Sequence, residues 1–412
     1  MTSGERREFG SRVAKLRRQR EMTQEELASA VGRTASWLSQ VERGVQPVNR
    51  LDVLRLLADG LGVSQQSLRP DAPVEPGATA HGAVRASNDL DGARLLISGH
   101  PLPDVLLGGQ ESSSADLAGL RLSVAKVWDL THSDHFAELS IALGGLVPRL
   151  EQAVRTAPQG ERPELWLLLS RTYQAVAAAF VRQDDPGAAW VAADRAIRAA
   201  EQSGQALHVF ASVFRLTQVF VRLRHLDQAE HAAAAAVAAI GQHTRGADTD
   251  PAALSVLGSL HLALALVHAR AGNRTQAQQE TSQARLVAQR LGEDRNDFDL
   301  EFGPTNVEIQ AVSISVDLGD AGEAIDRGER IDASGLSIER QARLLMDLGR
   351  AFAQRRQPGE ALDCLLRAEQ LAPEVVHTHS AARGAIRELV LLAGRSVSPE
   401  LRALAERADA KP

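Results

Sequence analysis

The sequence predicts an all-α protein, in which a small five-helix domain at the N-terminus is followed by an α-solenoid of helical pairs. Hydrophobic residues make up 44% of the 412 residues but aromatic residues only 3%, and this alanine- and leucine-rich composition favours helices over strands. Short helical patterns with clear start and stop signals fill the first 70 residues. A helical pattern with internal repeats then runs from about residue 115 onward.

The net charge of −6 is unevenly distributed along the chain. Residues 1–70 hold twelve Lys and Arg against eight Asp and Glu, whereas the remaining residues hold 34 against 44. A small basic end on an acidic body confines any contact with a polyanion to the N-terminus. One cysteine, Cys364, excludes an internal disulfide framework. The sequence shows no apolar signal-peptide core and no run of about 18 consecutive apolar residues. We therefore expect a cytoplasmic protein without a membrane span.

The first two helices are predicted from hydrophobic spacing and a capping signal. Phe9, Val13 and Leu16 lie on one face of an amphipathic helix that ends near residue 20. Thr23 is placed as the N-cap of the second helix, and Glu26 three residues later completes a capping box.

Glycines and further caps delimit the remaining helices of this domain. Gly32 ends the second helix, Thr34 caps the third, and Gly44 closes it. Asn49 caps a fourth helix and Ser64 starts a short fifth. Two short helices joined by a tight turn that contains glycine are typical of a helix-turn-helix.

One face of the third helix carries mainly small polar residues. On a helical wheel, an arc of about 140° holds Ala35, Ser36, Ser39, Gln40 and Arg43. The opposite side holds Trp37, Leu38 and Val41. Small side chains let a helix lie deep in a DNA major groove, where a glutamine can bond an adenine edge. The alternative is an ordinary solvated face on a helical hairpin.

The stretches "LRRQREMTQEELA" and "SWLSQVERG" resemble the Xre-type helix-turn-helix domain of phage repressors and many bacterial regulators, over roughly residues 5–69. The resemblance implies a double-stranded DNA operator as partner. Together with the wheel, it gives as base-reading residues Ala35, Ser36, Ser39 and Gln40. The expected phosphate contacts are Gln24, Thr34, Arg43 and Arg50. It also implies a structural ion pair between Arg17 and Glu42. The loop "GVQPVN" lacks the basic residues usual there, which removes some phosphate contacts.

A change of composition separates this domain from the rest. The stretch "RPDAPVEPGATAHGAVRAS" is rich in Pro, Ala and Gly and has no helical period, as in a linker. The predicted organisation is a DNA-binding domain over residues 1–70, a linker over 71–112 and a repeat domain over 113–412. Within the linker, "ARLLISGHPLPDVLLGG" could form a short helix or turn packed on the repeat domain.

Internal repetition organises the C-terminal region. The segment "ERQARLLMDLGRAFAQRRQPGEALDCLLRAEQLAP" fits a tetratricopeptide repeat with Ala361 at the twentieth position. Weaker copies align on Ala189, Ala229, Ala277 and Ala324, at spacings of 40, 48, 47 and 37 residues. A further helical pair over residues 115–157 caps the array. These repeats predict a right-handed solenoid with a concave inner surface.

The repeat region, over about residues 110–408, resembles a set of actinobacterial regulators that join an Xre-type domain to tetratricopeptide repeats. The resemblance is carried by "LVPRLEQAV", "AAWVAADRAIRAAEQSG" and "LGEDRNDFDLEFGPTNVEI", together with the best-fitting repeat. In its arrangement of domains, the chain is also similar to the peptide-sensing quorum regulators of Gram-positive bacteria. These resemblances imply control of transcription.

Polar residues recur at repeat positions expected to face the concave surface. Arginine occupies the thirteenth position of three consecutive repeats, as Arg182, Arg222 and Arg270. Such a row would bind a carboxylate on a peptide, a small molecule or a protein segment, whereas the alternative is that each arginine satisfies the last carbonyls of its own helix. The candidate ligand residues are Arg182, Gln218, Arg222, Arg270, Asn306 and Arg350. The segment "FGPTNVEI", which contains Asn306, is either a ligand-contacting elbow or simply a helix start.

The sequence favours a regulator over an enzyme. No catalytic set is recognisable, and the histidine pairs in "THSDH" and "VHTHS" have no further metal ligands beside them, so we expect no metal and no cofactor. We predict a nucleoid-associated transcriptional regulator that binds DNA as a homodimer, with the repeat domain as dimerisation and sensor domain. The alternative is an adaptor whose repeats bind a protein partner and whose helix-turn-helix tethers the complex to DNA. An antitoxin would share the N-terminal domain, but the large repeat body argues against it.

Overall fold

A computed structural model of the protein describes residues 3–20, 22–31, 33–46, 48, 53, 57, 61, 88–99 and 116–410, except 243, 245, 247 and 248. Within these residues the regular elements are helices, and one isolated β-bridge joins Arg295 to Phe302. The predicted all-α class is therefore confirmed. The chain divides into two compact units, Met1–Val84 and Arg85–Pro412.

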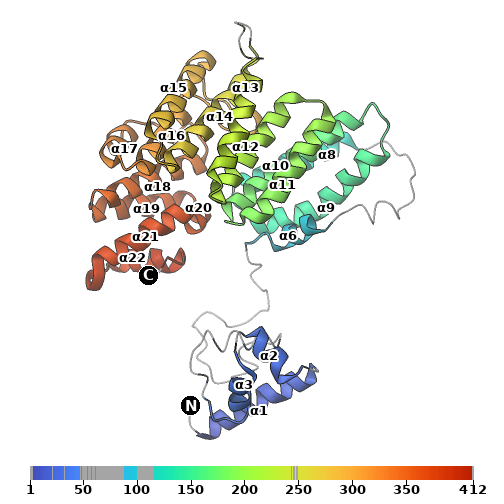
Figure 1. The fold of residues 1–412 in the computed structure, drawn as a ribbon, viewed down its shortest axis with the longest axis vertical. Coiled ribbons are helices and arrows are strands. Elements are labelled where there is room, and N and C mark those ends of the chain that lie inside the picture. The colour runs from blue at the N-terminus through green and yellow to red at the C-terminus, as the bar shows by residue number, and fades with distance from the viewer. Residues whose placement is uncertain are drawn as a thin grey trace. The chain divides into compact units, whose positions relative to one another are not determined.

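The N-terminal unit contains α1 (Ser3–Gln19), α2 (Gln24–Ala30) and α3 (Ala35–Glu42), drawn in blue in Figure 1. Their apolar faces form one core, which includes Phe9, Val13, Leu27, Leu38, Val41 and, from beyond α3, Val53, Leu57 and Leu61. The spacing of these last three buried residues by four positions is that of one helix face. The predicted caps at Asn49 and Ser64 lie outside the described residues, as do Gly32 and Arg50.

The predicted start signals of α2 and α3 are confirmed. The Thr23 backbone N–H donates to Glu26 Oε2 at 2.7 Å, and the Glu26 N–H donates to Thr23 Oγ1 at 3.2 Å, which is the reciprocal capping box. Thr34 Oγ1 accepts a hydrogen bond from the Trp37 N–H at 3.2 Å. The third helix ends at Glu42, and Gly44 then takes a left-handed conformation with φ of +72° that turns the chain away.

The C-terminal unit is a succession of antiparallel helical pairs, from green to red in Figure 1. The pairs are α8 (Leu117–His132) with α9 (Phe136–Thr156), α10 (Arg162–Arg182) with α11 (Pro186–Ser203), α12 (Ala206–Arg222) with α13 (Leu226–Ile240), α14 (Pro251–Arg270) with α15 (Arg274–Leu291), α16 (Pro304–Asp317) with α17 (Ala321–Gly328), α18 (Ile338–Gln354) with α19 (Pro358–Leu371), and, after α20 (Pro373–Thr378), α21 (Ser380–Ala393) with α22 (Pro399–Arg407). Short 3₁₀ turns, η1 (Asp297–Asp299) and η2 (Gly394–Ser396), precede α16 and α22.

The helix α6 (Asp91–Ser98) lies inside the predicted linker of residues 71–112. It packs on α9 and α11, with the buried side chains Ala93 and Ile97 in the same core as those helices. The C-terminal unit therefore begins before α8.

The turns inside the first six pairs share one conformation. In each, a residue with positive φ is followed by a backbone N–H that donates to the carbonyl five residues earlier, as from His135 to Leu130 at 3.0 Å and from Gln357 to Phe352 at 2.9 Å. The positive-φ residues are Asp134, Asp184, Arg224, Gly272, Gly319 and Arg356. Five residues after them come Leu139, Ala189, Ala229, Ala277, Ala324 and Ala361, all with no exposed surface. This confirms the predicted repeat register and extends it to the α8/α9 pair.

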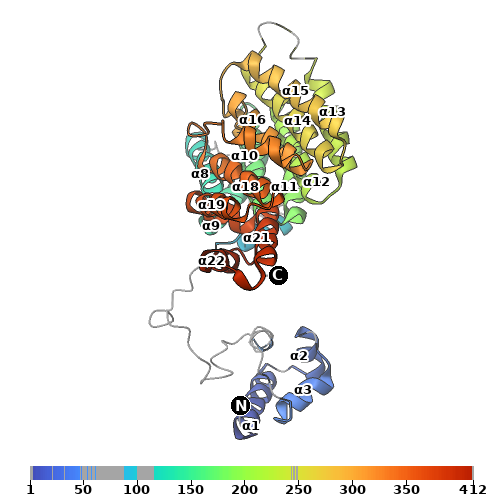
Figure 2. The ribbon, with the colours of Figure 1, turned by 90° about the vertical axis from the view of Figure 1, so that its left-hand side faces the viewer.

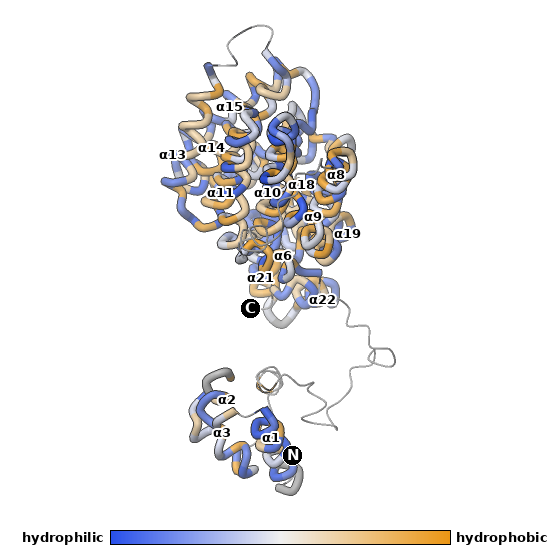
Figure 3. The backbone as a smooth tube through the Cα atoms, turned by 90° about the vertical axis from the view of Figure 1, so that its right-hand side faces the viewer, coloured by the Kyte–Doolittle hydropathy of each residue, from blue (hydrophilic) through white to orange (hydrophobic). Residues whose placement is uncertain are grey.

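The first helices of the pairs line up as neighbours in the order α8, α10, α12, α14, α16, α18 and α21. Seen from the side, the solenoid is coiled (Figure 2). The ion pair between Arg182 at the end of α10 and Glu339 at the start of α18 joins an early pair to a late one. Along the tube of Figure 3, hydrophobic and hydrophilic residues alternate within the helices, as expected for amphipathic helices packed in layers.

One of the described helices, α14, is long and apolar enough to cross a membrane by length and composition alone. Its apolar window is 83% buried inside the C-terminal unit. Burial among α12, α13, α15 and α16 accounts for its apolar character, as in a core helix.

Candidate DNA-binding surface and ligand cavities

The third helix presents the predicted reading face to solvent. Leu38 and Val41 have no exposed surface and anchor its inner side in the domain core. On the outer side, Ser36 is exposed, and half-buried positions are taken by Ala35, Ser39 and Gln40. The exposed face is therefore small and polar, which is what close approach to base edges requires.

The position of α3 against α1 depends on a glycine. A Cβ atom at Gly10 would lie 2.3 Å from the carbonyl oxygen of Val41 and 2.6 Å from that of Glu42. Only glycine allows the backbones of α1 and α3 to approach this closely, so Gly10 sets the distance between α3 and α1.

Glu42 ties α3 to both of the other described helices of this unit. Arg17 donates from Nε to Glu42 Oε1 at 2.6 Å and from Nη2 to Oε2 at 3.1 Å, and Gln24 Nε2 donates to Oε2 at 2.6 Å. Arg17 also donates to the Met22 carbonyl at 2.7 Å. The structure thus contains the predicted Arg17–Glu42 pair. Burial acts to raise the pKa of Glu42, but the hydrogen bonds from Arg17 and Gln24 outweigh it and hold that pKa below its usual value.

The predicted phosphate contacts have different surroundings. Arg43 is exposed next to the reading face, with a long hydrogen bond from Nε to the Ser39 carbonyl at 3.3 Å. Thr34 is also exposed, but its hydroxyl oxygen caps α3. Gln24 gives one of its two side-chain N–H groups to Glu42, so a phosphate would take the other.

In the C-terminal unit, the first predicted ligand residue is enclosed by protein. Arg182 donates to Asp134 Oδ1 and to the Thr131 carbonyl, at 2.7 and 2.8 Å, and pairs with Glu339 at the start of α18. Burial acts to raise the pKa of Glu339, but the charges of Arg182 and Arg343 outweigh it and bring that pKa far below its usual value. Arg182 therefore closes the coil of the solenoid, which differs from the predicted ligand-binding role.

A strained loop, residues 293–303, reaches between the helices of the inner surface. Three of its non-glycine residues have positive φ, namely Phe298, Asp299 and Glu301. Its backbone and side chains bind two arginines: Arg215 on α12 donates to the Asp299 carbonyl at 2.7 Å, and Arg340 on α18 donates to Glu301 Oε2 at 3.0 Å. We call this segment the inner loop. Strained backbone of this kind is more common at functional sites than elsewhere.

Two predicted ligand residues meet at a small cavity beside the inner loop, which we call the amide cavity. Its volume is about 60 Å³, and it is lined by residues that include Phe214, Gln218, Leu262, Leu300, Asn306 and Gln310. Asn306 is 3% exposed, and its Oδ1 is buried without a hydrogen-bond partner among the described residues. Gln218 Oε1 accepts from Arg215 at 3.3 Å. The segment "FGPTNVEI" therefore both starts α16 at Pro304 and lines a cavity.

Three further predicted ligand residues meet at a second cavity, which we call the arginine cavity. Its volume is about 620 Å³, and its wall shares Val221 with that of the amide cavity. Its charged lining consists of Arg222, Arg224, Arg270, Arg350, Asp184 and Asp317. Ser380, at the start of α21, completes the polar lining.

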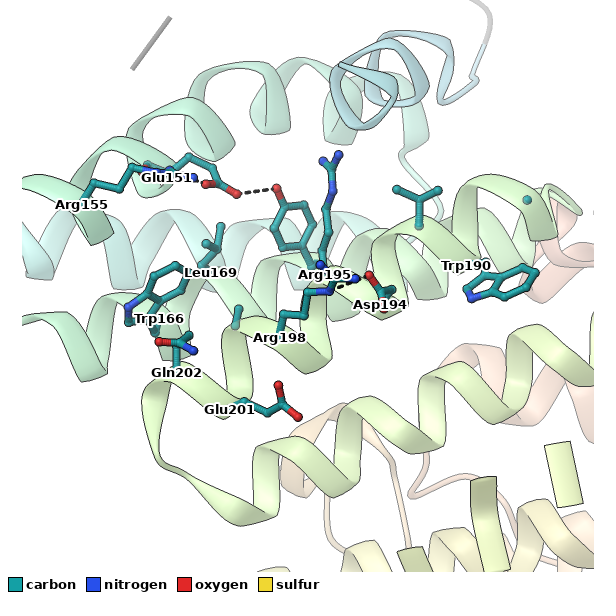
Figure 4. A pocket seen from close by; sticks show the side chains of 14 residues that line it. Glu151, Arg155, Trp166, Leu169, Trp190, Asp194, Arg195, Arg198, Glu201 and Gln202 are labelled. Atoms are coloured by element: carbon teal, nitrogen blue, oxygen red, sulfur yellow. Dashed lines mark hydrogen bonds and ion pairs between the residues drawn. The ribbon is translucent and has the colours of Figure 1, made fainter. Parts of the chain in front are cut away.

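A third hollow lies on the outer side of α9, α10 and α11 (Figure 4). It is lined by Trp166, Trp190 and several charged residues. Two pairs of these charges satisfy each other: Arg155 pairs with Glu151 at 2.6 Å, and Arg198 pairs with Asp194 at 2.9 Å. Arg195 donates to the Gly99 carbonyl at 3.1 Å. Because most of its charges are engaged on an open surface, this hollow is a weaker candidate than the two inner cavities.

Sequence reasoning missed Ser380, Arg340 and Leu300 as lining residues. Ser380 lies 158 residues from Arg222, to which its hydroxyl is hydrogen-bonded, and no local pattern links two such positions. Within the described residues, no group of three His, Cys, Asp or Glu side chains is arranged to hold a metal ion.

Comparison with known proteins identifies the N-terminal unit. The family model of a helix-turn-helix domain matches residues 8–71. No curated protein matches the chain significantly. The crystal structure of Bacillus thuringiensis PlcR in complex with the peptide PapR7 and DNA aligns with 92% of this chain and 99% of that one, at 14% identity and a TM-score of 0.32. The apo form of the competence regulator ComR from Streptococcus vestibularis aligns at 12% identity and a TM-score of 0.23, over 76% and 99% of the two chains.

Proposed function

We propose that the protein is a sequence-specific DNA-binding transcriptional regulator, in which α3 reads the major groove and the C-terminal solenoid senses a peptide or small-molecule ligand. The observation that carries the DNA-binding part is the helix-turn-helix domain, whose outer α3 face is small and polar and whose inner face is fixed to α1 and α2. Gln40 is the side chain suited to an adenine edge.

A single head of this size buries little DNA surface, so useful affinity requires two heads on one operator. We propose that the protein binds as a homodimer through the C-terminal unit, on two half-sites about 34 Å apart, which is one helical turn of DNA. Binding should weaken steeply with salt because phosphate contacts release counterions.

The test is a pull-down of genomic DNA fragments with the full-length protein, followed by footprinting at two salt concentrations. Gln40→Ala should relax the preference at one base pair of each half-site, by about 1–3 kcal/mol. The matched control is Gln276→Ala on an exposed face of α15, which should leave the footprint unchanged.

A symmetric footprint that changes only in Gln40→Ala supports direct reading by α3. Diffuse, salt-sensitive binding that is the same in both variants contradicts the proposal. It would favour an adaptor, whose head only tethers a protein complex to DNA.

A further inference from the structure

We propose that the arginine cavity binds an oxyanion, a carboxylate at the end of an apolar chain, with Arg222 as its counter-charge. This inference rests on the proposed sensing function of the C-terminal unit, and it names the chemistry of the ligand and the residue that recognises it.

The charges of the arginine cavity do not balance. Arg350 pairs with both Asp317 and Asp347, and Arg270 also pairs with Asp317, at 3.2 Å. These four residues neutralise one another. Arg222 stays outside this group, because no carboxylate of the described residues lies within 4.0 Å of its guanidinium.

The one hydrogen bond of the Arg222 side chain within the described structure goes to a neutral partner, Ser380 Oγ, at 3.1 Å. Burial and the nearby charges of Arg343 and Arg270 outweigh the opposing charge of Asp184 and lower the pKa of Arg222 to about 10. His379, next in the chain to Ser380, has a strongly lowered pKa because it is buried and faces the same arginines. A partly buried cation among other cations is costly unless an anion joins it.

The amide cavity supplies a second, independent sign of a ligand. Asn306 is buried, yet its side-chain oxygen has no partner among the described residues, and buried polar atoms are almost always hydrogen-bonded. Apolar side chains, among them Phe214, Leu262 and Leu300, line the same space. Val221 lies in the wall of both cavities, so the two are neighbours. In this proposal the anion of the ligand lies at Arg222 and the start of its apolar chain lies beside Val221.

The first test needs no ligand. Arg222→Met removes an uncompensated cation and should raise the unfolding midpoint of the full chain by about 1–3 °C. Arg350→Met, the matched control in the same cavity, leaves Asp347 without its cation and Asp317 with Arg270 alone, and should lower the midpoint by about 3–10 °C. Circular dichroism at 222 nm measures both. If the unfolding midpoint falls in both variants, or rises in both, Arg222 is not an uncompensated cation and the proposal is wrong.

The second test uses carboxylate probes and calorimetry, with no DNA present, so its outcome is independent of DNA binding. The probes are octanoate and a mixture of apolar heptapeptides with free C-termini, each compared with its neutral carboxamide. At least one carboxylate should bind wild type, its carboxamide should not, and Arg222→Gln should weaken that binding about 10- to 100-fold. Arg198→Gln on the outer surface should leave it unchanged.

A fatty acid and a peptide C-terminus carry the same anion. The probe that binds, octanoate or a heptapeptide, therefore shows which of the two supplies the carboxylate. Equal binding of carboxylate and carboxamide overturns the proposal. The proposal is also wrong if Arg222→Gln binds the carboxylate as well as wild type does, or if neither octanoate nor the heptapeptides bind wild type at millimolar concentration.

Discussion

The buried pair of Arg17 and Glu42 makes a quantitative prediction about the reading helix. Replacing Arg17 with Met removes two hydrogen bonds to Glu42 and one to the Met22 carbonyl, while the apolar stem keeps its packing. Glu42 is then held by Gln24 alone. Because Glu42 sits at the C-terminal end of α3, the loss falls on the attachment of α3 to α1.

The size of the expected destabilisation follows from the burial of the Arg17–Glu42 pair. The side chains of Arg17 and Glu42 are 10% and 6% exposed. Breaking a buried pair of this kind by removing one partner costs about 3–5 kcal/mol. Since Gln24 still donates to the carboxylate, we expect the lower end, about 3 kcal/mol. This is a large part of the stability of about 5–15 kcal/mol typical of a small domain.

This loss of stability is measured by amide hydrogen exchange of the full chain, followed on a peptide that contains α3. About 3 kcal/mol corresponds to a roughly 100-fold faster exchange of α3 when reclosing is faster than the chemical exchange step, because the rate then follows the opening equilibrium. The double variant Arg17→Met/Glu42→Met has no buried charge and should recover most of the protection. Unchanged protection in Arg17→Met, or a double variant no better protected than the single one, would refute the reasoning.

The same pair gives the sign of the pH dependence. The folded-state pKa of Glu42 lies below its ordinary value of 4.5, so the folded unit favours the ionised form. Its contribution to stability is complete above pH 4.5 and is lost as the pH falls through the lower, folded-state pKa. Exchange of α3 in wild type should accelerate on acidification beyond the intrinsic rate change, and in the double variant it should not.

Three other substitutions test the close contacts of both units. Gly10→Ala should push α3 away from α1, costing about 1–3 kcal/mol, and should weaken DNA binding in gel-shift titrations while the C-terminal unit keeps its unfolding midpoint. Gly258→Ala would place a methyl group 1.9 Å from the Phe302 ring, and should destabilise the inner loop enough for limited proteolysis to cut it faster than in wild type. Glu339→Gln leaves Arg182 paired with Asp134 alone, and should lower the urea midpoint by an amount equivalent to about 3 kcal/mol; no change would mean that this pair does not close the coil.

The limits of α2 and α3 were predictable because their signals are local. Thr23 with Glu26 and Thr34 with Trp37 are contacts between residues three apart, and hydrophobic spacing places Leu38 and Val41 inside. The start and end of α2 and α3 follow from these signals to within two residues. The tight approach at Gly10 is different, because it depends on the crossing of α1 and α3, which no spacing encodes.

The repeat register of the C-terminal unit was also predictable, since each pair repeats one turn and one buried small residue. Which of the inner residues remain free to bind a ligand could not be predicted from the sequence. Arg182 and Arg222 occupy the same repeat position, yet the coil brings the carboxylate of Glu339 to Arg182, 157 residues away, and the neutral hydroxyl of Ser380 to Arg222. Small rotations accumulated over several pairs decide such meetings. The inner loop was equally hidden, because Phe298 and Asp299 adopt positive φ against their own preference.

These long-range contacts connect the proposed anion site to the closure of the coil. Arg222 and Arg215 lie two helical turns apart on α12, and Arg215 holds the inner loop through the Asp299 carbonyl. The loop in turn holds the start of α18 through Glu301, next to the Glu339 that binds α10. An anion that neutralises Arg222 and engages α21 would therefore act on α12, the loop and α18 together.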